Sequence, residues 1–197
     1  KLKTAHLKAE QQAHRRLYEY YKKLPDKDLP DTLADMEPLF SAIEHGCAAG
    51  LYQETFDQIY WTRIRHKNNA FLVKQLGAHG SNLTILSNYF DQPWNNLVSD
   101  LTDDAKAATL NYTGFALQAV GRLREAARPM EASIELYAKN KDWKSAGINS
   151  SNLAGLHLIL GEIKSSLTAA KHSVAYAEKS NDSFWKMATL TTQADIY

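Results

Sequence analysis

A segment in the C-terminal half of the sequence recurs after about 40 residues, and this self-similarity restricts the possible folds more than any other feature. Residues 114–123 align with residues 154–163, and the match extends to Lys139 and Lys179. A repeated unit of this length cannot bury its apolar residues alone, so successive units must stack on one another. The sequence therefore predicts a repeat architecture rather than a single irregular domain.

A second match precedes each aligned segment. Residues 140–144 resemble residues 181–186 with one extra residue, which places Trp143 and Trp185 at equivalent positions, where we expect them to pack in the core. Ala194 follows Ala154 at the same interval that separates Gly114 from Ala154. A third unit is therefore expected to begin before the chain ends.

Each unit is predicted to be a helical hairpin. Gly121 and Gly161 follow the first helix of their units, and glycine can take the positive φ that turns the chain sharply. The residues expected where the two helices touch are small, so that the backbones approach closely: Gly114, Ala126, Ala154 and Ser166. Pro129 falls inside the predicted second helix of the first hairpin and is expected to kink it.

The first 24 residues predict one long helix. Their apolar residues recur with a mean spacing of 3.67, as on one face of an α-helix. These stripe residues are Leu2, Ala5, Ala9, Ala13, Leu17, Tyr20 and Leu24. Pro25 and residues 26–30 end the helix and form a linker.

The middle of the chain predicts further helices and no convincing strand. The expected helices cover residues 32–49, 51–66, 71–79 and 83–90, with breaks at Gly50, Asn68-Asn69 and Gly80-Ser81 and a loop at residues 91–94. Thr32, three residues before Asp35, is expected to cap the first of these helices. Thr102 is expected to cap the next helix, with Asp103 in its first turn.

The repeated segment resembles the tetratricopeptide repeat (TPR). In that family small residues mark the contact between the two helices, a glycine lies between them, and a large apolar residue follows an early alanine. Gly114, Leu117, Gly121, Ala126 and Met130 fit these places. In the next unit Ala154, Gly161, Ser166 and Ala170 occupy them, while His157 and Ser166 depart from the usual large apolar residue and alanine. The period of about 40 residues exceeds the 34 that is common in this family.

The resemblance implies an all-α fold, a right-handed superhelix of stacked antiparallel helix hairpins, that is, a TPR-like α-solenoid. We expect three parts. Residues 1–30 form an N-terminal amphipathic helix and linker, and residues 31–100 form degenerate helical repeats. Residues 101–197 form TPR-like repeats, the last of them truncated.

Long repeats of this kind, preceded by a stretch such as residues 14–21, also resemble the C-terminal sensor arrays of bacterial STAND-type signalling NTPases. That resemblance implies a sensing or partner-binding role, with further repeats or domains of the parent chain as neighbours. No phosphate-binding loop of an NTPase lies in this sequence.

The charge of the chain is close to balanced, at +1. Neither nucleic acid nor a membrane surface is therefore an expected partner, since both select a clear basic excess. The distribution is uneven: the net charge is +4 in residues 1–30, −6 in residues 31–104 and +3 in residues 105–197. This asymmetry suggests that the first helix could lie on an acidic neighbour, but solvated helix faces are the preferred explanation, because surface ion pairs contribute little.

No residue pattern indicates catalysis, a cofactor or a metal site. Cys47 is the only cysteine, which excludes a disulfide framework, and together with the lack of a signal sequence it leads us to expect a cytoplasmic protein. His45 and Cys47 are two residues apart and so point to different faces of a helix, with the cysteine buried. Glu10 and His14 share a face but have no third ligand nearby. We therefore expect no catalytic residues, no metal and no cofactor.

The resemblance places a partner on the concave face, which the first helix of each hairpin lines. The residues that map there are Asn111, Phe115, Gln118, Ser151, Asn152, Gly155 and Thr191, with Asp195 in the truncated unit. This lining is neutral and lacks the Lys and Arg with which chaperone-binding relatives hold a carboxylate. The hypothesis is an extended or helical peptide whose backbone is held by the Asn amides.

These observations lead to two function hypotheses and disfavour a third. The first is a protein–protein interaction scaffold that binds a protein or peptide ligand as the sensing or regulatory repeat domain of a larger bacterial signalling protein. The alternative is a helical-repeat module that holds an oligomer together. An enzyme has no supporting residue constellation.

Overall fold

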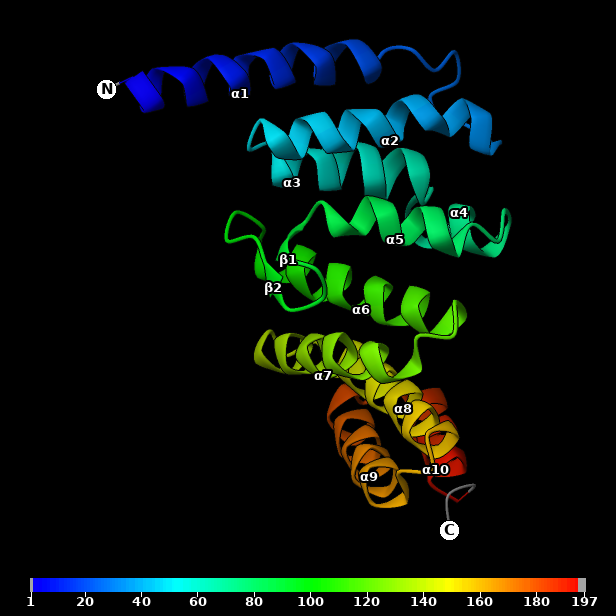
Figure 1. Ribbon diagram of the computed structural model, residues 1–197. Helices are drawn as coiled ribbons and strands as arrows, with labels where there is room; N and C mark the ends of the chain where they lie inside the picture. Colours follow the sequence, from blue (N-terminus) through cyan, green and yellow to red (C-terminus); the bar gives the residue numbers. More distant parts are fainter. Residues whose placement is uncertain (1, 195–197) are drawn as a thin grey trace. The chain divides into compact units, whose positions relative to one another are not determined.

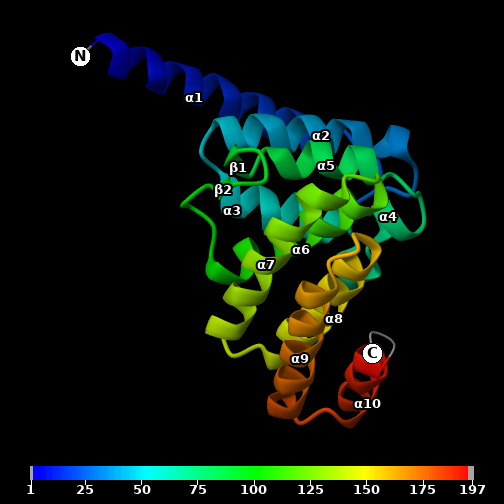
Figure 2. The same ribbon diagram turned by 60° about the horizontal axis from the view of Figure 1, so that its bottom comes forward.

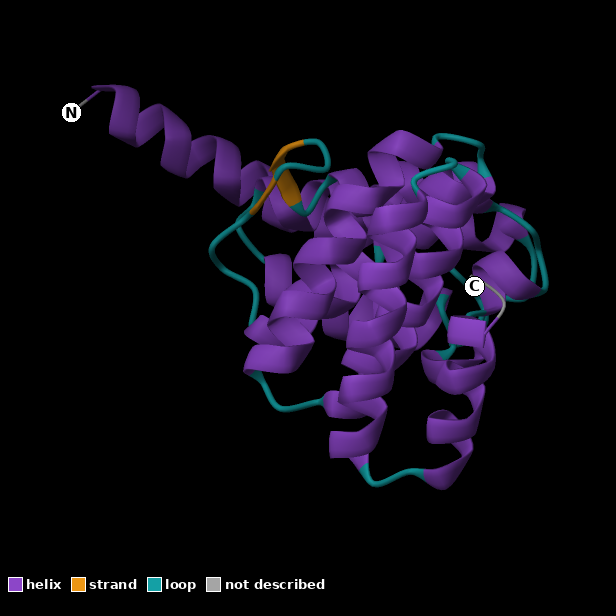
Figure 3. Cartoon of the chain, turned by 90° about the horizontal axis from the view of Figure 1, so that it is seen from below, coloured by secondary structure: helices purple, strands orange, loops and turns teal. Residues whose placement is uncertain are grey.

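The computed structural model describes residues 2–194 and is almost entirely helical (Figures 1 and 3). The prediction of an all-α protein is confirmed. The chain divides into two compact units, unit 1 from Lys1 to Leu101 and unit 2 from Thr102 to Tyr197.

Unit 1 contains most of the irregular helices. Its elements are α1 (Leu2–Tyr21), α2 (Leu33–Ala48), α3 (Tyr52–Glu54), η1 (Thr55–Ile64), η2 (Lys67–Asn69), α4 (Phe71–Lys74), α5 (His79–Ser87), β1 (Phe90–Gln92) and β2 (Asn96–Leu97). The cap predicted for α2 is confirmed, because the backbone N–H of Asp35 donates to Thr32 Oγ1 at 3.1 Å. This bond satisfies one of the amide groups that a helix N-terminus leaves unpaired.

The helix expected over residues 51–66 is present but has an unexpected form. Its main part, η1, is a π-helix, and its ladder ends with the N–H of Arg65 donating to the carbonyl of Tyr60, five residues back, at 2.9 Å. Each turn of a π-helix holds more residues than an α-turn, and this form is rare. Ile59 and Ile64, five residues apart, are both fully buried, and a π-turn brings residues with this spacing to the same side of the helix.

Two other expectations for unit 1 are wrong. The break predicted at Gly80-Ser81 lies inside α5, and the chain turns instead just before it, where Gly77 takes a φ of +63°. The absence of strands is also incorrect, since β1 and β2 form a small antiparallel hairpin with Phe90 opposite Leu97. Strands of three and two residues are too short to produce a visible alternation.

Tyrosines fill the centre of unit 1. Tyr18, Tyr60 and Tyr89 are fully buried, and each hydroxyl donates a hydrogen bond. Tyr60 donates to Asn82 Oδ1 at 2.9 Å and Tyr89 donates to Thr55 Oγ1 at 3.3 Å. Burying these large rings is favourable because no hydroxyl is left without a partner.

Unit 2 consists of five regular helices in the part of the chain that the structure describes (Figure 2). They are α6 (Asp103–Ala119), α7 (Leu123–Lys139), α8 (Trp143–Ile159), α9 (Ile163–Ser180) and α10 (Ser183–Ala194). α6 packs chiefly on α7, and α8 chiefly on α9, so each predicted hairpin forms. α8 also contacts α7, and α10 contacts both α8 and α9.

The repeat period governs the ends of these helices. The side chains of Thr102, Asp142 and Asp182 accept backbone N–H groups at the starts of α6, α8 and α10. Gly121 and Gly161, at +80° and +75°, confirm the predicted left-handed turns inside the hairpins. Local cap and turn chemistry therefore sets the helix lengths.

The caps also correct the alignment of the tryptophans. Asp142 and Asp182 are separated by the same interval as Gly121 and Gly161, so no extra residue lies between the two helix starts. Trp143 is thus the first residue of α8 and Trp185 the third of α10, so their positions are not equivalent. Trp143 stacks on Tyr176 of α9 at 6.1 Å between ring centroids.

The predicted close approach of the two helices is confirmed in both hairpins. A Cβ added to Gly114 would lie 2.5 Å from Met130 Cγ, and Ser166 Oγ donates to the carbonyl of Ala154 at 2.8 Å. α7 runs from Leu123 to Lys139 with Pro129 inside it. Pro129 is buried at the position that Ala169 occupies in the second hairpin, so it belongs to the packed face of α7.

Candidate functional site

The residues predicted to bind a partner lie on three helices of unit 2. Asn111, Phe115 and Gln118 are on α6, Ser151, Asn152 and Gly155 are on α8, and Thr191 is on α10. Asp195 lies outside the described residues. Phe115 is 39% exposed, and a Cβ added to Gly155 would meet no atom within 4 Å, so these two positions border open space.

Part of this predicted face takes part in helix packing. Ser151 Oγ donates to Thr192 Oγ1 at 2.9 Å, which joins α8 to α10 beside Thr191. Asn111 Oδ1 is buried without a hydrogen-bond partner. Within residues 2–194, no hydrogen bond or ion pair connects the predicted residues of α6 to those of α8. The structure therefore joins Ser151 to α10 through Thr192, the neighbour of the predicted Thr191, and makes no such link to the predicted residues of α6.

A groove of about 570 Å³ lies on a different side of unit 2, between α7, α8 and α9. The lining residues come from all three helices. They are Glu131, Ile134 and Glu135 of α7, Ser150, Leu153 and His157 of α8, and Lys164, Ser165, Thr168, Ala169, His172 and Tyr176 of α9. We call this site the α7–α9 groove.

The groove and the predicted face use opposite sides of α8. At about 100° per residue, Leu153 and His157 point within about 60° of Ser150. Ser151 and Asn152 instead point about 100° and 200° away from Ser150 on the same helix. The predicted residues of α8 therefore lie outside the lining of this groove, although the same helix contributes to it.

Departures from the repeat explain the position of the groove. Ser150 and His157 occupy the positions that Leu110 and Leu117 hold in the first hairpin, where both leucines are buried. A hydroxymethyl group in place of a leucine side chain removes packing volume, and the imidazole introduces polar atoms. Polar residues at repeat positions that are otherwise core leucines were the signal in the sequence that could have located the groove.

His157 closes one part of the groove. Its Nδ1 lies 2.7 Å from Glu162 Oε2, and its Nε2 lies 3.9 Å from Glu131 Oε1 of α7. The His157 side chain is only 9% exposed, and these two carboxylates fix the orientation of its ring. This contact also joins α7 to the turn between α8 and α9.

The two walls of the groove carry opposite charges. Glu131 and Glu135 are one helical turn apart on α7, and Lys164 lies on α9. The floor between the walls is apolar at Leu153 and Ala169, both buried. Such a surface offers an apolar contact flanked by one acidic and one basic edge.

The floor also holds an unsatisfied hydroxyl. Ser150 is 1% exposed, and its Oγ has no hydrogen-bond partner. A buried polar group without a partner destabilises the fold by about 1–3 kcal/mol.

Cys47 and His45 of α2 point to different sides of the helix, as predicted. Cys47 is buried with its Sγ 3.5 Å from Thr55 Oγ1, while the His45 ring faces His14 with 3.1 Å between the Nδ1 atoms. Burial raises the pKa of the Cys47 thiol to about 12. A thiol that stays protonated in this way is a weak nucleophile.

The described part of the chain offers neither a metal site nor a membrane-spanning helix. Among residues 2–194, no group of three or more His, Cys, Asp or Glu side chains is placed to hold a metal ion. No helix in that range has both the length and the apolar character required to cross a membrane. Comparison of the chain with known protein families, curated protein sequences and solved structures finds no match.

Proposed function

We propose that this chain is a protein-interaction module of helical repeats, and that the α7–α9 groove of unit 2 binds a peptide segment of a partner protein. The observation that carries the proposal is the groove itself. Its apolar floor and oppositely charged walls are features by which a concave site selects a polypeptide.

The size of the groove supports a short segment. Lys164 and Tyr176 mark its extent along α9, and twelve residues of helix span about 18 Å. This length accommodates about three turns of a helix or five to six extended residues. The groove would be complemented by a segment with an apolar centre. Its basic side chains would face Glu131 and Glu135, and its acidic side chains would face Lys164.

The resemblance to TPR arrays supports a finer proposal. In it, the hairpins stack as a right-handed superhelix and serve as the sensing or regulatory part of a larger bacterial signalling protein, related to STAND-type NTPases. The cap and turn positions that recur with the repeat period support the stacked-repeat part of this proposal. A cytoplasmic location belongs to the same proposal.

The test blocks the groove without disturbing the helix that forms its wall. Peptides are first selected from a random library on the wild-type chain. Thr168→Trp, on an exposed groove position of α9, should then weaken their binding at least about tenfold by filling the cavity. Lys171→Trp places the same ring at an exposed position of α9 outside the groove lining and should leave binding unchanged.

The same peptides distinguish this groove from the other candidate face. Equal binding to the Thr168→Trp and Lys171→Trp variants would exclude the groove. Loss of binding in the Asn111→Ala/Asn152→Ala variant alone would instead assign the ligand to the face predicted from sequence. If no peptide is selected and the chain sediments as a concentration-dependent oligomer, the alternative function, an oligomerisation module, is favoured.

A further inference from the structure

Among the residues of α1 whose side chains the structure describes, 6–21, the contacts with the rest of unit 1 come from one side of the helix. Tyr18 is fully buried and its hydroxyl donates to Glu54 Oε1 at 2.9 Å. One turn earlier, His14 contacts His45 of α2, and one turn later, Lys22 Nζ donates to Gln58 Oε1 at 2.8 Å. These residues, spaced by four, define the attached side of α1.

The apolar stripe of α1 lies on another side. At about 100° per residue, Ala9, Ala13, Leu17 and Tyr20 point about 100° to 180° away from Tyr18. All four are exposed, Leu17 by 40% and Tyr20 by 59%. The stripe continues just beyond the helix at Leu24, which is 43% exposed.

This arrangement is unusual for a helix of a folded protein. A helix on a protein surface normally turns its apolar stripe toward the core. The attached side of α1 instead consists of His14, Tyr18 and Lys22, joined by Tyr21, whose ring centroid lies 5.5 Å from that of His45. The residues of regular apolar spacing face solvent. Residues 6–13 are exposed on all sides, and this part of α1 projects beyond α2 (Figures 1 and 2).

Positive charge lies along one edge of the exposed stripe. At about 100° per residue, the exposed Arg16 and Lys23 point within about 60° of the nearest stripe residue, whereas the exposed Lys8 and Arg15 point about 100° or more away. Glu10, which is also exposed, points within about 20° of Leu17 at the opposite edge. The surface that α1 offers is therefore a narrow apolar stripe with two cations along one edge and one carboxylate on the other.

We propose that the exposed stripe of α1, formed by Ala9, Ala13, Leu17 and Tyr20, docks an acidic amphipathic helix of a different protein. The two alanines allow the backbones of two helices to approach closely, and Leu17 and Tyr20 supply the larger apolar contact. Glu or Asp side chains beside the stripe of the partner would face Arg16 and Lys23.

Two other occupants fit less well. A second copy of α1 would bring the same excess of positive charge, because residues 1–30 carry eight Lys and Arg against four Asp and Glu. A lipid surface is favoured by helices with Trp, Phe or several Leu on the apolar side, whereas half of this stripe is alanine. The experiment below would detect binding to either a second copy or a lipid surface.

The experiment measures binding of a fluorescent synthetic peptide of about 20 residues, long enough to form a helix, with a Leu and Ala stripe and Glu on the flanks. One control peptide has the same composition in scrambled order, and another has Lys in place of Glu. The full 197-residue chain is used. Only the acidic amphipathic peptide should bind, and added salt should weaken its binding.

Four variants locate the contact. Leu17→Asp and Arg16→Glu should each raise the Kd of the acidic peptide at least about tenfold. The control variants Ile159→Asp and Lys171→Glu also replace an aliphatic residue by Asp and a cation by Glu, but at exposed positions of unit 2. They should leave the Kd unchanged. Because Leu17 and Arg16 are exposed, far-ultraviolet circular dichroism and the thermal midpoint should match those of the wild type.

Several results would overturn the proposal. These are no binding of the acidic peptide, equal binding of the scrambled peptide, or an unchanged Kd in the Leu17→Asp variant. Dimerisation of the wild type that Leu17→Asp abolishes would assign the stripe to a second copy. Co-sedimentation with vesicles of phosphatidylserine and phosphatidylcholine that is lost in the same variant would assign it to a membrane surface.

Discussion

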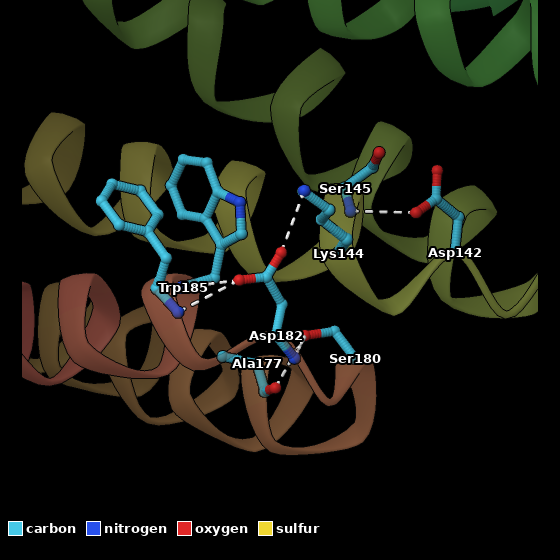
Figure 4. A network of polar contacts seen from close by, with 8 residues as sticks. Asp142, Lys144, Ser145, Ala177, Ser180, Asp182 and Trp185 are labelled. Carbon is cyan, nitrogen blue, oxygen red and sulfur yellow. Dashed lines mark hydrogen bonds and ion pairs between the residues drawn. The ribbon is translucent and has the colours of Figure 1, made fainter.

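Lys144 Nζ lies 3.0 Å from Asp182 Oδ2, and this ion pair joins the start of α8 to the start of α10 (Figure 4). The other oxygen of Asp182 accepts the backbone N–H groups of Phe184 and Trp185 at 3.1 and 3.3 Å. One carboxylate therefore caps a helix and links it to the preceding hairpin. Both roles require the ionised form.

This arrangement predicts the behaviour of unit 2 in acid. The hydrogen bond from Lys144, and then that from the N–H of Trp185, hold the pKa of Asp182 below its usual range. The ionised carboxylate therefore stabilises the fold above the pKa of the unfolded chain, about 3.9, and this contribution is lost as the pH falls through the folded pKa. A ¹³C titration of the carboxyl group should show the low pKa, and Lys144→Met should raise it.

The matched control for that titration is Asp103. A separate residue pair has the same effect there: the hydrogen bond from Lys139 lowers the pKa of Asp103. Lys144→Met should leave the Asp103 titration unchanged. An unaltered pKa of Asp182 in the Lys144→Met variant would show that the ion pair does not form in solution.

Gly114 and Gly155 predict opposite effects of one substitution. Gly114→Ala should destabilise unit 2 by about 1–3 kcal/mol, since the added Cβ would collide with the side chain of Met130. Gly155→Ala places a methyl group in open space inside a helix and should stabilise by about 0.5–1 kcal/mol. Urea unfolding of both variants measures the two changes, and equal effects would contradict the close contact of α6 and α7.

Two left-handed turns, one between the hairpins and one inside the second hairpin, offer a second pair of substitutions. Lys141 has a φ of +61° between α7 and α8, a conformation that costs a residue with a Cβ about 1–2 kcal/mol. Lys141→Gly should therefore stabilise the chain by about 0.5–1 kcal/mol, whereas Gly161→Ala, at +75°, should destabilise it by about 1 kcal/mol. Thermal unfolding provides the measurement, and destabilisation by Lys141→Gly would show that the left-handed turn is not populated.

Refilling the groove should separate stability from binding. Ser150→Leu restores the residue type found at Leu110, removes an unsatisfied hydroxyl and fills part of the cavity. We expect the free energy of unfolding to rise by about 1–2 kcal/mol while peptide binding in the α7–α9 groove is lost. The reverse change, Leu110→Ser, should destabilise by about 2–5 kcal/mol without opening the groove. Retained peptide binding by Ser150→Leu would place the ligand elsewhere.

The thiol of Cys47 should be protected in the folded chain. With the pKa raised to about 12 by burial, little thiolate is present at pH 8. Reaction with 5,5′-dithiobis(2-nitrobenzoic acid) should be slow in buffer and complete within seconds in 6 M guanidinium chloride, about the concentration that unfolds most domains. Rapid labelling of the folded chain would show that α2 opens locally.

Local signals predicted the unit 2 helices well. Thr102 and Gly121 specify where α6 begins and ends, since a cap and a left-handed turn depend on residues close in sequence. Unit 1 was predicted less accurately. The π-helix η1 brings Ile59 and Ile64, five residues apart, to the core together, whereas an α-helix would point them about 140° apart, and no local signal announces a helix that accommodates packing in this way.

The sequence by itself determined that the chain is helical, where most helices of unit 2 start and stop, and which small residues allow α6 and α7 to touch. Only the tertiary structure decided which side of each helix is covered. Periodicity identifies the apolar stripe of α1, but the burial of Tyr18 against α2 and α3 leaves that stripe in solvent. Likewise, the side of α8 that carries Ser150 lines the groove, whereas the side that carries Asn152 does not. A helix face is covered or left open by residues distant in sequence, and their placement is a property of the packed chain.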